Sequence, residues 1–139
     1  MILLDTNVVI DAQNEKSPSF ARAKKVITEA VASSGAAVNA VILAELCAGK
    51  ENISDLVQTE LHEAGVQLFD LPSGAAPICG RAYRHYHLQR RKSGGAAAPR
   101  IPLPDFFIGA HAQLMGWKLA TRDSERYRLY FPDVELIEP

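Results

Sequence analysis

Short apolar runs alternate with longer segments of helical periodicity along this chain. Parallel strands need crossover connections of about a dozen residues or more, and the segments between the apolar runs are of that kind. The pattern therefore predicts the α/β class, a three-layer α/β/α sandwich with a central parallel sheet of about five strands. The expected strands are Ile2–Leu4, Ala36–Val38, Val66–Leu71, Trp117–Ala120 and a last one near Val134–Ile137.

Local signals place the helices between these strands. Ser17 and Pro18 form an N-cap and first-turn proline pair, and Asn39 is the expected cap of the next helix. The Gly/Ala/Pro-rich stretch 93–104 is too short for an interdomain linker, so residues 1–139 are expected to form one domain. Further helices are expected over roughly Ser54–Glu63, over Ala75–Lys92 and from Asp105 to Gly116.

The composition is that of a globular protein, with 47% apolar and 22% charged residues. No apolar run approaches the roughly 20 residues needed to cross a bilayer. The first residues carry no basic leader of the kind that begins a signal peptide. Cys47 and Cys79 are interpreted as buried free thiols in a reducing compartment. We therefore expect a cytoplasmic protein without membrane association.

Four acidic residues, far apart in the sequence, stand at the edges of apolar runs: Asp5, Glu45, Asp105 and Asp123. Burying a carboxylate costs several kcal/mol unless it is neutralised, paired or bound to a cation. Asp5 and Asp123 follow predicted strands and the other two lie on predicted helices, so all four are expected at the carboxyl edge of the sheet. Oxygen-only ligands suit Mg²⁺ or Mn²⁺, which lowers the pKa of a bound water for attack on a phosphodiester.

Each acid also has an ordinary structural explanation. Asp105 before a helix is a common N-cap, Asp5 can belong to a simple turn, and Asp123 can balance the arginines beside it in a loop. Glu45 is the least expected on structural grounds, because it interrupts an apolar helical segment. The combination of the four, rather than any one of them, predicts a metal site.

Basic side chains gather in one segment, although the net charge of −1 excludes a strongly basic nucleic-acid binder. On the helix expected over Ala75–Lys92, an apolar stripe faces one way and several arginines face the other. This surface is either a solvated helix face or a surface that follows a phosphate backbone. Its basic residues, with one from the following loop, are Arg81, Arg84, Arg90, Arg91, Lys92 and Arg100.

Four segments, in order along essentially the whole chain, carry a family resemblance. They are Leu3-Leu4-Asp5-Thr6-Asn7 with Ile10-Asp11, Ala44-Glu45-Leu46 with Gly49, Asp105-Phe106-Phe107-Ile108-Gly109-Ala110-His111-Ala112, and Leu119-Ala120-Thr121-Arg122-Asp123. On these segments the chain resembles the PIN-domain family, and within it the VapC-like and FitB-like toxins of bacterial toxin–antitoxin pairs.

The resemblance implies a PIN-like parallel α/β sandwich that binds Mg²⁺ or Mn²⁺ and cleaves RNA. It assigns the metal-binding and catalytic roles to Asp5, Glu45, Asp105 and Asp123, and supporting hydrogen bonds to Thr6 and Thr121. It also implies a homodimer, and a small DNA-binding antitoxin whose tail covers the active-site groove.

The chain departs from the family pattern in three places. Asn39 stands where a Ser or Thr cap is usual, and Gly109 where the helix commonly has Ala. Asn caps well and Gly costs at most about 1 kcal/mol in a helix, so both are expected to be tolerated. The stretch Ser93–Pro104 is longer and richer in Gly and Ala than the family pattern, which affects the shape of the substrate groove rather than the chemistry.

The leading hypothesis is a metal-dependent endoribonuclease, the toxin of a toxin–antitoxin pair. Arg81, Arg84, Arg90, Arg91 and Lys92 would contact either the RNA or the antitoxin. One alternative is a catalytically silent PIN-fold module that binds nucleic acid or protein. A less favoured alternative is a phosphatase with an aspartyl nucleophile at Asp5, because such an enzyme needs a second Asp two residues on and position 7 is Asn.

Overall fold

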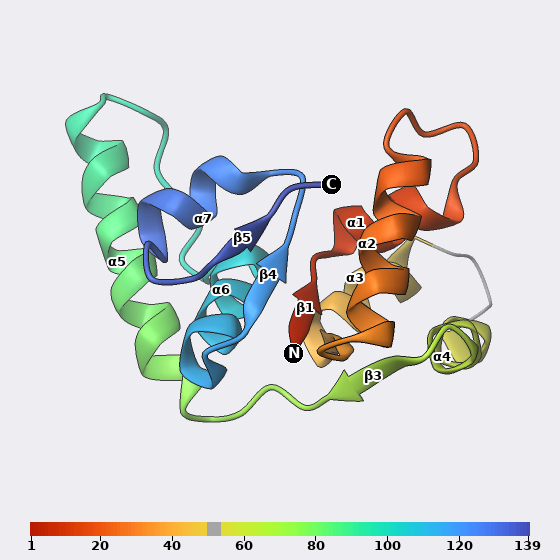
Figure 1. Ribbon diagram of the computed structural model, residues 1–139. Helices are drawn as coiled ribbons and strands as arrows, with labels where there is room; N and C mark the ends of the chain where they lie inside the picture. The colour runs from red at the N-terminus through yellow and green to blue at the C-terminus, as the bar shows by residue number, and fades with distance from the viewer. Residues whose placement is uncertain (50–53) are drawn as a thin grey trace.

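A computed structural model of the protein describes residues 1–49 and 54–139, and in these it contains five strands and seven helices (Figure 1). In chain order they are β1 (Ile2–Leu4), α1 (Thr6–Gln13), α2 (Phe20–Ala32), β2 (Ala36–Asn39), α3 (Ala40–Ala48), α4 (Ser54–Glu63), β3 (Val66–Phe69), α5 (Ala75–Lys92), α6 (Pro104–Met115), β4 (Lys118–Ala120), α7 (Ser124–Tyr130) and β5 (Leu136–Ile137).

The strands form one parallel sheet in the order β3-β2-β1-β4-β5. β1 lies at its centre, where Leu3 is paired with Ala37 on one side and Leu119 on the other. Helices lie on both sides of the sheet (Figure 1), which confirms the three-layer α/β/α sandwich. The order of strands reverses beside β1, so the crevice between the carboxyl ends of β1 and β4 is where a site is expected in such a sheet.

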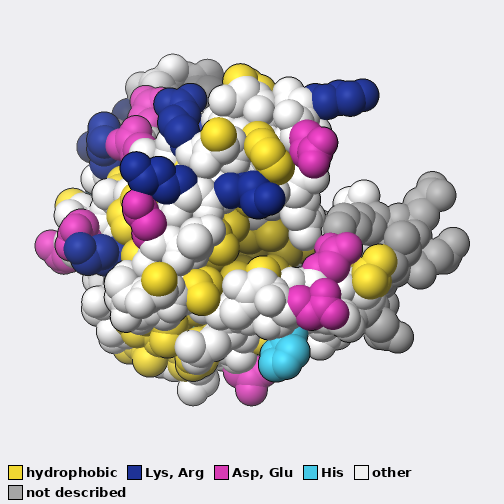
Figure 2. All heavy atoms as spheres, turned by 45° about the vertical axis from the view of Figure 1, so that its right-hand side comes forward, with side chains coloured by type: hydrophobic (Ala, Val, Ile, Leu, Met, Phe, Trp, Pro, Cys, Tyr) yellow, Lys and Arg dark blue, Asp and Glu magenta, His cyan; other side chains and the backbone are white. Residues whose placement is uncertain are grey.

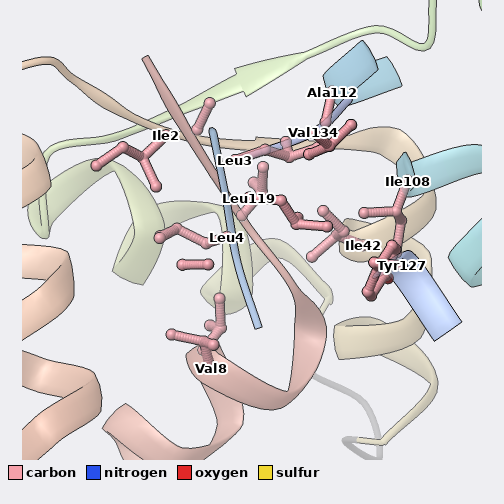
Figure 3. Close-up of a cluster of buried hydrophobic side chains, with 14 of the residues drawn as sticks. Ile2, Leu3, Leu4, Val8, Ile42, Ile108, Ala112, Leu119, Tyr127 and Val134 are labelled. Atoms are coloured by element: carbon pink, nitrogen blue, oxygen red, sulfur yellow. The ribbon is translucent and has the colours of Figure 1, made fainter. Parts of the chain in front are cut away.

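The core is built from both the strands and the helices that cover them. Leu3, Leu4 and Leu119 are fully buried in the sheet, and the apolar faces of the helices meet them there. Burying each such side chain stabilises the fold by about 1.5–3 kcal/mol. Figure 3 shows this cluster, in which Val8 of α1, Ile42 of α3, Ile108 of α6 and Tyr127 of α7 join the strand residues.

Two of the predicted helix ends are as expected. Asn39 caps α3, because its side-chain oxygen accepts hydrogen bonds from the backbone N–H groups of Val41 (3.1 Å) and Ile42 (3.0 Å). Gly116 ends α6 in the left-handed conformation with φ of 63°, which Gly adopts without a steric penalty.

The predicted start of the second helix is wrong by two residues. α2 begins at Phe20 with Ser19 at the cap, so Ser17 and Pro18 lie before it. Ser17 instead links α1 to this turn, because its hydroxyl donates to Asp11 at 2.7 Å and accepts the backbone N–H of Ser19 at 3.2 Å. Strands β3, β4 and β5 are also shorter than predicted.

Helix α7 has no counterpart among the predicted elements. It has only seven residues, and Tyr127 is its single buried residue. Phe131, four residues later, is also buried. These two aromatic residues are the only apolar pair at helical spacing that the segment buries, which is too weak a pattern to predict a helix.

In the part of the chain that is described, no helix has the length and apolar character required to cross a membrane. Cys79 is buried and Cys47 half-buried, and both thiols are free. The prediction of buried free thiols therefore holds fully only for Cys79.

Candidate active site

All four predicted acids line one pocket of about 240 Å³ at the carboxyl edge of the sheet, together with Thr6, Asn7 and Ile10. Asp5 follows β1, Glu45 lies on α3, Asp105 on α6, and Asp123 directly before α7. The pocket is thus assembled from four elements that are distant in the sequence. The roles of these residues as metal ligands and catalytic groups remain predictions.

Asp5 is the most buried of the four, with 4% of its surface exposed. Its carboxylate accepts hydrogen bonds from the Thr121 hydroxyl (2.7 Å), the Thr6 backbone N–H (2.7 Å) and the Asn7 amide (2.9 Å). Burial raises the pKa of Asp5 above its ordinary value, and the nearby carboxylates of Asp105 and Glu45 raise it further, against the lowering effect of the hydrogen bonds. A cation in the pocket would lower the pKa of Asp5 again, because it would stabilise the charged carboxylate.

Glu45 is positioned by the start of α3. Its carboxylate accepts a hydrogen bond of 2.5 Å from the Thr6 hydroxyl. Thr6 therefore makes a hydrogen bond of the supporting kind that was predicted for it. The Asn39 cap fixes the register of the helix that carries Glu45. Because Thr6 also binds Asp5 through its backbone, this residue links the two carboxylates.

Asp105 lies in the first turn of α6 but does not cap it, because Leu103 is the N-cap and Pro104 the first helical residue. Its carboxylate instead forms an ion pair with Arg126 of α7. Local patterns in the sequence give no hint of this pair, because the two residues belong to different elements that meet only in the fold.

Asp123 is exposed, and its side chain makes no capping hydrogen bond to α7. The Thr121 hydroxyl, which also donates to Asp5, accepts the Asp123 backbone N–H at 3.1 Å. The alternative in which Asp123 balances the neighbouring arginines is wrong, since Arg122 pairs with Asp11 and Arg126 with Asp105.

In residues 1–49 and 54–139, no three acidic, His or Cys side chains are placed to hold a metal ion together as they stand. Three of the carboxylates are instead bound by donors of the protein: Asp5 by Thr121, Glu45 by Thr6 and Asp105 by Arg126. The chemistry of the set nevertheless fits Mg²⁺ or Mn²⁺, since it consists of carboxylate oxygens at the edge of one pocket. For Asp105 to offer both oxygens to an ion, Arg126 has to move away.

Several residues of the site had no predicted role, although three of them belong to the family segments of the sequence. Asn7 donates to Asp5 and accepts the Arg122 backbone N–H at 3.0 Å, so it joins the start of α1 to the loop after β4. Arg122 contacts both oxygens of the buried Asp11, at 2.9 and 3.1 Å, and ties α1 to the same loop. The Tyr127 hydroxyl lies 3.4 Å from Asp5, and burial raises its pKa far above the ordinary value.

Of the six predicted basic residues, five lie on α5 and Arg100 lies in the loop after it, and none of them lines the acidic pocket. Arg81, Arg84, Arg91 and Lys92 are exposed. Arg90 differs from them, because its guanidinium donates to the Ala96 carbonyl at 3.0 Å and to the Tyr86 hydroxyl at 2.8 Å. It therefore anchors the loop that follows α5.

Several solved structures share this fold. The VapBC2 complex of Rickettsia felis bound to a fragment of promoter DNA aligns with a TM-score of 0.65 and 19% identity, over 100% of this chain and 99% of that one. FitAcB of Neisseria gonorrhoeae aligns with a TM-score of 0.62 and 22% identity, over 100% and 98%. VapBC-1 of nontypeable Haemophilus influenzae aligns with a TM-score of 0.67 and 20% identity, over 99% and 98%.

The sequence itself matches the model of the PIN domain over residues 2–132, which is nearly its whole length. No curated protein matches it. The parallel sheet, the pocket at its carboxyl edge and the family model agree, and the chain belongs to the PIN-domain family.

Proposed function

We propose that this protein is a metal-dependent endoribonuclease and the toxin of a toxin–antitoxin pair. The observation that carries the proposal is the convergence of Asp5, Glu45, Asp105 and Asp123 on one pocket beside the central strand. Four carboxylates in one pocket repel one another, and a divalent cation is the ordinary way to hold them charged. The likeness to toxin–antitoxin complexes such as VapBC2 supports the biological role.

Asp5, Glu45 and Asp105 would hold Mg²⁺ or Mn²⁺ in this proposal. When bound, such an ion lowers the pKa of a coordinated water and polarises the phosphoryl oxygen of the substrate. Thr121 and the Thr6 backbone hold the Asp5 carboxylate in one orientation, and the Thr6 hydroxyl does the same for Glu45. Asp123, whose carboxylate makes no capping bond, would bind the ion or orient the attacking water.

The test is cleavage of single-stranded RNA with Mg²⁺ or Mn²⁺, with an EDTA control. Asp5→Asn and Asp105→Asn are expected to abolish cleavage, while Asp133→Asn, an exposed acid outside the pocket, retains it. Equal cleavage by the wild type and the pocket variants would identify a contaminating nuclease and overturn the proposal.

One observation favours a PIN-fold binding module without turnover: Arg126 already neutralises Asp105. The module and the nuclease differ in their response to metal. An ion that binds the native state raises its melting temperature, so the nuclease is expected to melt at a higher temperature with millimolar Mn²⁺ than with EDTA. An unchanged melting temperature, with RNA bound but not cleaved, would favour the module.

Besides the active-site groove, which its tail is expected to cover, the proposed antitoxin has a second suitable docking surface. A pocket of about 700 Å³ lies between α1, α2 and α4, with Val9, Ile27, Val31 and Leu61 among its lining residues. Figure 2 shows hydrophobic side chains at the floor of a hollow on this face. The neighbouring solved structures are complexes that contain an antitoxin, and an amphipathic antitoxin helix is the occupant that suits an apolar groove.

This part of the proposal can be tested by co-expression with the product of the adjacent gene. The two proteins are expected to copurify, and Val31→Asp, which places a charge in the partly exposed lining of the groove, is expected to separate them. Copurification that survives Val31→Asp would place the partner elsewhere. We also propose that the protein is a homodimer and that it is cytoplasmic. Sedimentation velocity measures its oligomeric state.

A further inference from the structure

Residues 71–104 contain six of the fifteen Lys and Arg residues of the chain and none of its sixteen Asp and Glu residues. Outside this segment, three of the four arginines pair with carboxylates: Arg122 with Asp11, Arg126 with Asp105 and Arg128 with Glu138. In contrast, no basic residue of the segment 71–104 forms an ion pair with any residue that the structure describes. Within the described residues, the positive charge of this segment is therefore uncompensated.

The loop after α5 folds back along that helix (Figure 1). Tyr83 donates its hydroxyl to the Pro99 carbonyl at 2.6 Å, and His87 Nε2 lies 3.1 Å from the same oxygen. Since a carbonyl oxygen only accepts, Nε2 of His87 carries the proton. At the beginning of the loop, Arg90 holds the Ala96 carbonyl and the Gly95 backbone N–H donates to the Arg90 carbonyl at 3.1 Å. These bonds fix the path of a segment whose residues are mostly exposed.

The folded-back loop creates a basic pocket. It brings Arg100 next to Arg84 and Arg91 of α5, around a volume of about 440 Å³ that Gly80, Tyr83, His87 and Leu88 complete. No acidic residue of the described chain lines this pocket. Three guanidinium groups that share one pocket repel one another unless an anion lies between them. Their planar forks match the oxygens of a phosphate.

The basic pocket also lies near the acidic one. Arg100 is five residues from Asp105, so their Cα atoms are at most about 18 Å apart. That is a span of only a few nucleotides of a single strand. α5 packs on both α6 and α7, the two helices that carry Asp105 and Arg126.

We propose that Arg84, Arg91 and Arg100 bind a backbone phosphate of the RNA strand that is cleaved at the acidic pocket. This inference rests on the proposed ribonuclease function and adds to it a second contact of the RNA strand, outside the acidic pocket. The loop 93–104, longer than the family pattern, then serves to bring the third arginine to α5.

The experiment measures binding of a fluorescein-labelled single-stranded RNA to the wild-type protein in EDTA, so that cleavage does not contribute. Fluorescence anisotropy gives Kd at several salt concentrations. Arg84→Gln and Arg100→Gln are each expected to weaken binding severalfold and to reduce the salt slope by about 0.7, the value for one lost phosphate contact on a single strand. Arg22→Gln, an exposed arginine of α2, is the matched control and is expected to leave both unchanged.

Unchanged Kd and slope in Arg84→Gln and Arg100→Gln would overturn the proposal. An equal loss in Arg22→Gln would also overturn it, because binding would then depend on diffuse charge. Competition by an acidic peptide of equal charge, as effective as unlabelled RNA, would show a protein-binding surface instead. Because these readouts need neither metal nor cleavage, failure of the nuclease assay and failure of this pocket are separate results.

Discussion

Arg126 and Asp105 form an ion pair that joins α7 to α6 at the border of the acidic pocket. Both side chains are partly exposed, 33% for Arg126 and 27% for Asp105. The guanidinium thus supplies positive charge at the carboxylate that is predicted to bind a divalent ion. Arg126 and the ion are therefore expected to compete for the oxygens of Asp105.

Arg126→Gln is accordingly expected to bind Mn²⁺ more tightly than the wild type, by up to about fivefold, since a partly exposed ion pair contributes only ~0.2–1 kcal/mol. Isothermal titration calorimetry measures this without any assay of activity. Arg128→Gln, on the same helix but paired with Glu138 away from the pocket, is the control and should titrate like the wild type. Weaker Mn²⁺ binding by Arg126→Gln would mean that the arginine orients Asp105 for the ion instead.

Gly109→Ala is expected to destabilise the protein by about 1–3 kcal/mol, the usual cost of an overpacked core. A Cβ at this position would lie 2.4 Å from the Phe131 ring, so α6 and the end of α7 would have to separate. The sequence predicts only that Gly is tolerated here, and the structure adds that the Phe131 ring occupies the space of a Cβ. Urea unfolding measures the loss, and the second substitution Phe131→Leu should recover part of it. A Gly109→Ala protein as stable as the wild type would show that the ring has room to move.

The buried His111 is expected to make the stability depend on pH. Burial lowers its pKa in the folded state below the ordinary 6.5. As the pH falls below 6.5, the unfolded chain takes up a proton here that the folded chain refuses. The free energy of unfolding then decreases, by at most about 1.4 kcal/mol per pH unit, until the lowered pKa is reached. Above pH 6.5 the contribution is fully present.

Urea unfolding between pH 5 and 8 measures this slope. His111→Gln should reduce it, whereas His62→Gln, an exposed histidine of α4, should leave it unchanged. The comparison between variants cancels the opposite effect of Asp5, whose raised pKa favours the folded state at low pH. Equal slopes in the wild type and His111→Gln would contradict the prediction.

Asn39→Ser tests why an amide stands at the cap of α3. The side-chain oxygen of Asn39 caps the helix, and its nitrogen lies 3.2 Å from Nδ1 of His111. Ser would keep the cap but leave the buried Nδ1 without its partner, at a cost of about 1–3 kcal/mol. Thermal unfolding measures the cost. An Asn39→Ser protein of unchanged stability would show that water replaces the amide.

Much of the fold follows from local patterns in the sequence. The bounds of α4 and α5 agree with the predicted ranges, because Gly65 and the turn before Ala75 mark their ends clearly. β3 is shorter than its prediction, since its pairing with β2 ends at Phe69 although Asp70 and Leu71 continue the extended pattern. α7 escapes prediction because seven residues hold too little of a helical period to stand out.

The acidic pocket is predictable for a similar reason, because each carboxylate adjoins an apolar run whose place in a parallel sheet is known. The partners of these carboxylates are not predictable. Whether Arg126 meets Asp105 depends on the rotation of α7 against α6, and no local sequence pattern indicates that rotation. The role of Arg90 as an anchor likewise depends on a loop that folds back through hydrogen bonds to backbone carbonyls.

The central position of β1 has a consequence for synthesis on the ribosome. Asp5 and Glu45 come from the first third of the sequence, while Asp105 and Asp123 come from its last third. A nascent chain that has not yet released β4 holds at most three of the four carboxylates and lacks a neighbour of its central strand. The proposed hydrolytic centre therefore cannot assemble until β4 and the residues after it have emerged.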